Sequence, residues 1–162
     1  MENSRRKNMR LEQYDYSVPG AYFVTICTSG KARILSSVSV GAGVLDGPRI
    51  LLTKYGQMVE ARLLEMNKVY AQTQTKRYVI MPNHVHLLIM VSGASGTPPP
   101  TRENQLIPLY ISTLKRMTNK AAGRQLWQRG YYDHIIRGSA DYETKWRYID
   151  ENPAKWAEDE YY

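Results

Sequence analysis

One apolar stretch, residues 78–91, constrains the fold of this chain more than any other feature. It is the most apolar run in the sequence and carries two of the three histidines, His84 and His86. Successive side chains of an extended strand point to opposite faces, so the two imidazoles share one face while Val85 and Leu87 share the other. The sequence therefore predicts a buried strand that presents two imidazoles side by side.

Pro82 extends this prediction to a pair of strands. Proline has no amide hydrogen and interrupts a sheet ladder, so residues 76–91 are expected to form two strands that meet near Pro82 and Asn83. Both faces of the stretch are apolar. This pattern is typical of central strands that helices cover on at least one side.

Hydrophobic periodicity and turn residues predict the remaining elements. These are a strand at 21–28, a hairpin at 34–52, a helix at about 53–69 capped by Thr53, a helix at about 104–122, a strand at 126–137, a helix at about 140–151 capped by Ser139, and a short helical piece after Asn152-Pro153. Their order favours an α+β fold. We expect a ferredoxin-like α/β sandwich, an antiparallel sheet with helices mainly on one face.

Length and composition define the class of protein. The 162 residues suffice for a single domain, 1–162, with a basic arm at 1–20 and a flexible loop at 92–103. The single cysteine, Cys27, excludes an internal disulfide and a cysteine-based zinc site. No run approaches the ~20 apolar residues of a membrane span and no signal peptide is recognisable, so we expect a cytoplasmic protein with no membrane partner.

The net charge is +7 and the sequence pI is near 9.5. A basic chain favours a polyanionic partner, nucleic acid first, which would place the protein at the nucleoid. Aromatic side chains can stack on unpaired bases while basic side chains hold phosphates. The candidate phosphate contacts are Arg5, Arg6, Lys115, Arg116, Lys120 and Arg124. A solvated tail and a solvated helix face are the alternatives for these residues.

The helix expected at 140–151 carries two polar groups off its apolar stripe. Tyr142, Trp146 and Ile149 recur at helical spacing and form the predicted buried face. Tyr148 lies about 100° from Ile149 around the helix axis. Asn152 follows Tyr148 by four residues and shares its face. The helix therefore presents a phenol and a carboxamide together.

The phenol, the carboxamide and the two imidazoles are together suited to the cleavage of a phosphodiester. A phenol can act as a nucleophile, and attack on a phosphodiester would form a reversible phosphotyrosine ester. A divalent cation held by His84, His86 and Asn152 would polarise the scissile phosphate. A ligand set without thiolates and with a carboxamide oxygen favours Mg²⁺ or Mn²⁺. By spacing alone, satisfied core histidines and a packing tyrosine explain the same residues.

Three motifs resemble one family, the single-tyrosine HUH transposases, and are closest to its REP-associated tyrosine transposase branch. Residues 78–89, with His84-Val85-His86, resemble the HUH motif (His, hydrophobic, His). Residues 14–25 resemble that family's entry into its first strand. Residues 127–137, followed by 148–153, are similar to the C-terminal signature of the REP-associated branch. The resemblance covers nearly the whole chain.

The resemblance implies a function for each matched residue. His84, His86 and Asn152 would be metal ligands, and Tyr148 would be the nucleophile. The family cuts single-stranded DNA near imperfect hairpins and leaves a 5′-phosphotyrosine and a free 3′-OH. Some members are homodimers that exchange the tyrosine helix, whereas REP-associated members can act as monomers, so a homodimer is possible.

Several alternatives remain open from the sequence. Tyr131 and Tyr132 are rival nucleophiles, ranked lower because strand aromatics usually pack. His134 is interpreted as a hydrogen-bonded structural residue. At the level of function, a non-catalytic module that binds single-stranded nucleic acid is the main alternative, and it predicts binding that survives chelation of metal. A small-molecule metalloenzyme is disfavoured by the charge and by the lack of an evident acid/base carboxylate beside the histidines.

Overall fold

The computed structural model describes residues 20–39, 47–92 and 106–162, which contain a four-stranded antiparallel sheet. Its strands are β1 (Gly20–Cys27), β4 (Thr73–Ile80), β5 (His84–Val91) and β6 (Tyr132–Ile135), in the spatial order β4-β5-β1-β6. Helix α1 (Lys54–Val69) links β1 to β4, and helix α2 (Leu106–Ala122) links β5 to β6. This is the ferredoxin-like arrangement, which confirms the predicted fold class.

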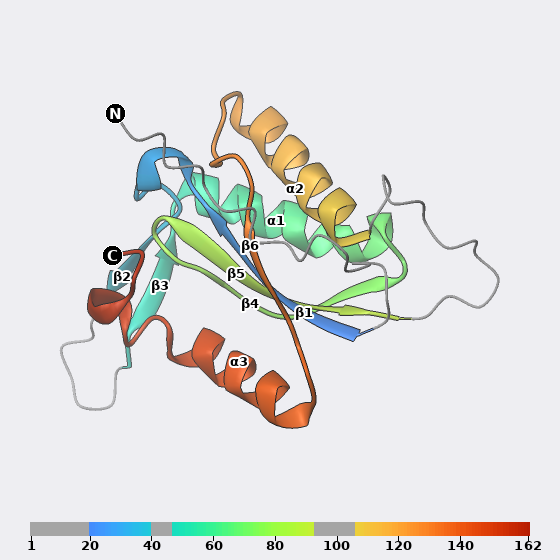
Figure 1. Ribbon diagram of the computed structural model, residues 1–162. Helices are drawn as coiled ribbons and strands as arrows, with labels where there is room; N and C mark the ends of the chain where they lie inside the picture. Colours follow the sequence, from blue (N-terminus) through green and yellow to red (C-terminus); the bar gives the residue numbers. More distant parts are fainter. Residues whose placement is uncertain (1–19, 40–46, 93–105) are drawn as a thin grey trace, which may run out of the picture.

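The helices divide between the two faces of the sheet (Figure 1). Helices α1 and α2 cover one face, and their apolar side chains join those of β1 and β5 in the larger core. Helix α3 (Ser139–Glu151) covers the opposite face, where Ile149 packs on Phe23, Val79 and Leu88. The expectation of helices mainly on one face holds for α1 and α2, and α3 creates a second, smaller core.

The alternation predicted for β5 is present. Val85 and Leu87 point into the larger core, whereas His84 and His86 lie on the face that α3 covers. Both histidines are buried, with at most 1% of their surface exposed. In the sheet, Thr25 is paired with His86. The two imidazoles are thus held by central strands, as expected from the sequence.

The boundaries of α1 follow from its N-cap. The Thr53 hydroxyl accepts a hydrogen bond from the Gly56 amide at 3.2 Å, as predicted for this cap. Gly56 allows the first turn to approach Leu35 closely, because a Cβ on Gly56 would overlap the Leu35 carbonyl. Helix α2 ends as predicted at Ala122, and residues 104 and 105 lie outside the described part of the chain.

The prediction that Ser139 caps α3 is wrong. Ser139 is the first helical residue, and the N-cap position belongs to Gly138, which has φ of 100° and no side chain to offer. The carboxylate of Asp141, in the first turn, instead binds the segment before the helix, since it accepts hydrogen bonds from the Arg137 amide at 2.9 Å and from His134 at 2.7 Å. His134 therefore has the structural role expected from the sequence.

The remaining segments agree with the predictions in part. Strands β2 (Ser36–Ser39) and β3 (Arg49–Leu52) form the expected hairpin as a separate two-stranded sheet. The strand predicted at 126–137 is shorter, β6, with an isolated bridge from Trp127 to Thr28 before it. The predicted C-terminal helical piece is one 3-10 turn, η3 (Trp156–Glu158). Residues 1–19 of the arm and 93–103 of the loop lie outside the described residues.

None of the helices in the described ranges combines the length and the apolar character required to cross a bilayer.

Candidate metal and nucleophile site

The two histidines each use one ring nitrogen in a hydrogen bond. His84 Nδ1 donates to the side-chain oxygen of Asn83 at 2.8 Å, and His86 Nδ1 bonds the Thr25 hydroxyl at 2.8 Å. The ring centres are 4.6 Å apart. Among the described residues, neither Nε2 atom has a hydrogen-bond partner. Histidine ligands of metals typically have this pattern, with one nitrogen oriented by the protein and the other free.

Burial keeps these imidazoles uncharged. Desolvation lowers the pKa of His84 to about 4, although the nearby Asp159 carboxylate and the Asn152 amide oppose the shift. Desolvation also lowers the pKa of His86 well below its ordinary value, and the charges of His84 and Lys145 act in the same direction. Neutral imidazole is the form that binds metals, so the pair is ready to coordinate at neutral pH.

Asn152 supplies the third predicted ligand atom. It follows the last residue of α3 and is 3% exposed. Its amide nitrogen donates to Asp159 at 2.7 Å, while its oxygen Oδ1 is buried and has no hydrogen-bond partner among the described residues. A buried acceptor without a partner is costly, and a bound ion is one way to satisfy it. Each of the three ligands predicted from the sequence thus has a buried nitrogen or oxygen without a hydrogen-bond partner in the described part of the chain.

Asp159 joins this group from the C-terminal segment, and sequence reasoning missed it. Its carboxylate side chain is 1% exposed, and Oδ2 lies 3.8 Å from His84 Nε2. Ligand atoms of His84, His86 and Asp159 all lie within 4.8 Å of one another, a His-His-Asp group that could hold a metal ion. Two imidazoles with a carboxylate and a carboxamide suit a divalent cation. The signal in the sequence was weak, one acid in an acidic stretch.

The C-terminal segment, residues 156–162, is tied across the histidine pair. Asp159 Oδ1 accepts a hydrogen bond from the Tyr161 amide at 2.8 Å, and the Asn83 side chain donates to the Tyr161 carbonyl at 2.6 Å. The Arg33 guanidinium lies 5.3 Å from the Trp156 ring centre and 4.4 Å from that of Tyr162. These contacts explain how a residue near the chain end reaches the buried histidines.

Tyr148 lies beside the histidines in the same chain. Its ring meets that of His86 edge-on, with centres 5.2 Å apart, and that of Phe23 with centres 5.8 Å apart. The side chain is 37% exposed, so a substrate can reach it. Burial, followed by the negative charges of Asp159 and Glu160, raises the pKa of Tyr148 to about 12. The predicted nucleophile and predicted ligands therefore converge without a second chain.

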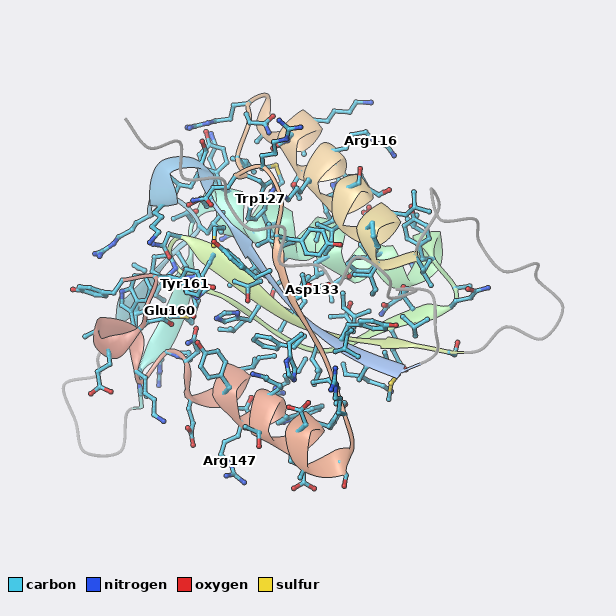
Figure 2. All side chains as sticks on the ribbon, in the orientation of Figure 1. Arg116, Trp127, Asp133, Arg147, Glu160 and Tyr161 are labelled. Carbon is cyan, nitrogen blue, oxygen red and sulfur yellow. The ribbon has the colours of Figure 1, made fainter. Side chains whose placement is uncertain are left out.

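A cavity of about 680 Å³ opens beside Tyr148 and His86. Most of its lining residues come from β1, β6, α3 and the C-terminal segment. Figure 2 shows Tyr161 and Glu160 on the C-terminal segment and Asp133 on β6, three of the residues that line it. The volume falls within the range of ligand pockets, about 300–1,000 Å³. The site is thus open to a substrate.

The rival tyrosines differ in position. Tyr132 lines the cavity and is 39% exposed, so it remains within reach of a substrate. Tyr131 packs against the larger core on the face that α1 and α2 cover. Tyr161 also lines the cavity, and burial raises its pKa. Tyr132 and Tyr161 are therefore the phenols to compare with Tyr148.

The four predicted phosphate contacts that the structure describes do not line this cavity. Lys115, Arg116 and Lys120 belong to α2, which covers the opposite face of the sheet, where Figure 2 labels Arg116. The Lys115 ammonium donates to the carbonyls of Gln128, at 2.8 Å, and Gly130. Arg124 lies 5.8 Å from the Tyr55 ring centre. Arg5 and Arg6 lie outside the described residues, and DNA contact by all six stays a prediction.

Comparison with known proteins adds three findings. No protein-family model matches the chain. An uncharacterized protein of Haemophilus influenzae is 29% identical over 174 residues, which cover 97% of this chain and 93% of that protein. The solved structure of a REP-associated tyrosine transposase bound to a REP hairpin aligns with a TM-score of 0.63 and 19% identity, over 91% of this chain and 73% of the other. This chain therefore has the fold of a REP-associated tyrosine transposase.

Proposed function

We propose that this protein is a metal-dependent endonuclease and strand transferase for single-stranded DNA, a transposase that acts near hairpins through a 5′-phosphotyrosine. One observation carries the proposal. The buried nitrogens of His84 and His86 and the buried oxygen of Asn152 lack hydrogen-bond partners among the described residues, and Tyr148 stands beside them at an open cavity. The fold shared with a transposase that was solved on a DNA hairpin adds support.

The reaction follows from the chemistry of a phenol. As the Tyr148 oxygen forms its bond to phosphorus, the bond from phosphorus to the 3′-oxygen breaks. The phenol loses its proton, and the departing 3′-oxygen gains one to become a free 3′-OH. The phosphate stays on the 5′ side of the cut as an ester of Tyr148. Attack by a 3′-OH on this ester reverses the step, so strands can be cut and rejoined.

The environment of Tyr148 explains why an ion would matter. Burial and two acidic neighbours raise its pKa to about 12, so the phenolate is rare at neutral pH. A divalent cation bound by His84, His86 and Asn152, with Asp159 as a further oxygen ligand, would supply positive charge at the scissile phosphate and offset the acidic neighbours. Mg²⁺ and Mn²⁺ fit this mixed nitrogen and oxygen set.

The test is a covalent adduct between protein and DNA. Hairpin-bearing single-stranded oligonucleotides are incubated with the protein and either Mg²⁺ or Mn²⁺, and adducts are separated under denaturing conditions. The wild type is expected to form an adduct that EDTA prevents, and Tyr148→Phe is expected to form none. DNA binding that survives chelation, without an adduct on any substrate, would indicate a non-catalytic binding module instead.

The control variants are the two other phenols of the cavity. Tyr132→Phe and Tyr161→Phe remove the same hydroxyl from neighbouring positions while leaving the ring in place. Both are expected to keep the adduct, and peptide mapping of the wild-type adduct should place the DNA on Tyr148. An adduct that persists in Tyr148→Phe but disappears in Tyr132→Phe would reassign the nucleophile to β6.

A further inference from the structure

Lys145 occupies the same side of α3 as Tyr148. The two residues are three apart on the helix, a spacing that makes their side chains neighbours. Both line the cavity that His86 and Phe23 also border. Arg147, between them in sequence, is exposed and projects away from the sheet, as Figure 2 shows. The helix thus turns one cation toward the site and another toward solvent.

The Lys145 ammonium lies near an aromatic ring, and acidic side chains share its surroundings, since Asp141 lies one helical turn earlier and Asp133 and Glu160 line the same cavity. The ammonium lies 5.1 Å from the centre of the Phe23 ring, and that ring stacks on His86 with centres 5.2 Å apart. In the described part of the chain, no carboxylate forms an ion pair with it. Asp141, one turn earlier, is hydrogen-bonded to His134 and to the Arg137 amide. The positive charge of Lys145 also acts on His86, where, after burial, it contributes to the lowered pKa.

A half-buried cation without an ion pair, set near the prospective metal ligand His86, works against the binding of a second cation there. The arrangement becomes favourable when an anion lies between the Lys145 ammonium and a metal ion at the histidines. A phosphodiester at Tyr148 would be such an anion. We propose that Lys145 binds the phosphate at the cleavage point, on the side opposite the histidine pair. This inference rests on the proposed function, since it places the scissile phosphate at Tyr148.

The proposal assigns the cavity to the nucleotide that carries this phosphate. Tyr132 and Tyr161 line the cavity with aromatic rings, on which an unpaired base can stack. Lys145 would hold the phosphate by charge, as lysine does at many phosphate sites. Lys145 would thereby position the phosphorus for the Tyr148 oxygen, and it would contact the reacting group itself.

The experiment measures DNA binding in the Tyr148→Phe background, with EDTA, so that neither cleavage nor metal contributes. Single-stranded hairpin oligonucleotides carry one neutral methylphosphonate, moved along the strand one position at a time. Lys145→Met is compared with Arg147→Met as the matched control and with Lys145→Arg as the conservative variant. Each variant is first shown to unfold at the same temperature as its parent.

Lys145→Met should weaken binding roughly 10-fold at low salt and reduce the slope of log K against log salt by about 0.7. At one position, methylphosphonate should weaken the parent by a similar factor and leave Lys145→Met unchanged, because each change removes the same contact. Arg147→Met should show no such coupling, and Lys145→Arg should retain it. Additive losses at every position, or equal losses for Arg147→Met, would overturn the proposal.

The adduct assay separates this proposal from the proposed function. If wild-type protein forms no adduct but the coupling is found, Lys145 binds a phosphate and the cleavage reaction is what fails. If the wild type forms the adduct and Lys145→Met forms it at the same rate, with additive losses in binding, the role of Lys145 fails and the cleavage reaction stands.

Discussion

At the scale of the residue, the site is defined by which nitrogens of His84 and His86 have a hydrogen-bond partner and which do not. Asn83 and Thr25 each engage one nitrogen of a histidine, and these contacts leave the Nε2 atoms directed at a common space. Replacing a hydrogen-bonding partner of a ligand changes the orientation of the ring without removing the ligand itself. The partners of His84 and His86 are therefore part of the site.

Thr25→Val tests this role, because valine keeps the shape of threonine and removes its hydroxyl. We expect Mn²⁺ affinity to fall by about 10- to 100-fold, as the His86 ring loses the bond that orients it. Isothermal titration calorimetry measures the affinity. Thr144→Val is the control, since within the described ranges the Thr144 hydroxyl bonds only to the carbonyl of Ala140, on the exposed side of α3. Equal affinities for the two variants would contradict the prediction.

Cys27 offers a second residue-scale prediction, because it is the single cysteine of the chain. Burial raises the pKa of its thiol from 9.0 to about 11, although Lys31 and Lys115 oppose the shift. The folded state therefore holds the proton more tightly than the unfolded state. Alkylation by iodoacetamide at about pH 8 should be about 100-fold slower in folded protein than in urea-unfolded protein, because the thiolate is the reactive form.

The pH profile checks the cause of this slow reaction. With EDTA present, the alkylation rate of folded protein should rise to half its maximum near pH 11. A half-maximal rate at pH 9 or below would show that the thiolate forms as readily as in a solvated thiol.

At the scale of the element, close contact with a neighbouring backbone limits the residue at position 56 of α1 more than helix propensity does. Gly56 sits in the first turn of α1, where the Leu35 carbonyl accepts the Thr53 amide at 3.0 Å. Helix propensity alone predicts that alanine would stabilise this position by about 1 kcal/mol. A Cβ here would instead overlap the Leu35 carbonyl. The clash involves backbone, which cannot rotate away.

We therefore expect Gly56→Ala to lower the free energy of unfolding by roughly 1–3 kcal/mol, the usual cost of overpacking. Urea unfolding followed by circular dichroism measures it. Gly47→Ala is the matched control, since a Cβ there meets no atom of the described residues within 4 Å. That control should change stability by less than about 0.5 kcal/mol. A gain in stability for Gly56→Ala would mean that propensity outweighs the contact.

At the scale of the whole molecule, one chain contains all parts of the candidate site. The sheet holds His84 and His86, and α3 brings Tyr148 and Asn152 to them from the face opposite α1 and α2. The C-terminal segment closes the group with Asp159. No exchange of the tyrosine helix between two chains is needed to assemble this arrangement.

Mixing two inactive variants tests this arrangement. Tyr148→Phe retains the proposed ligands, and His84→Ala retains the proposed nucleophile. We expect a mixture of the two to form no covalent DNA adduct, because neither chain has a complete site. A mixture of wild type and Tyr148→Phe, the control, should form adduct in proportion to the wild type. Adduct restored in the mixture of inactive variants would indicate a site shared between chains.

Several features could be predicted from local pattern. The alternation in β5 placed both histidines on one face, and the helical spacing of α3 placed Tyr148 and Asn152 together. The order of elements was sufficient for the ferredoxin-like fold. These predictions succeed because the periods of strands and helices are fixed by backbone geometry over a few residues. Ser139 failed as a cap because Gly138, with its positive φ, begins the helix earlier.

What the sequence by itself determined is which side chains share a face. Only the tertiary structure decided which of those faces meet. Asp159 reaches His84 across some seventy residues of chain, Lys145 shares a cavity with His86, and Lys115 lies behind the sheet bonded to loop carbonyls. No repeating pattern in the local sequence predicts any of these contacts. They arise because helices and strands bury their apolar faces together, and the polar groups meet where that packing brings them.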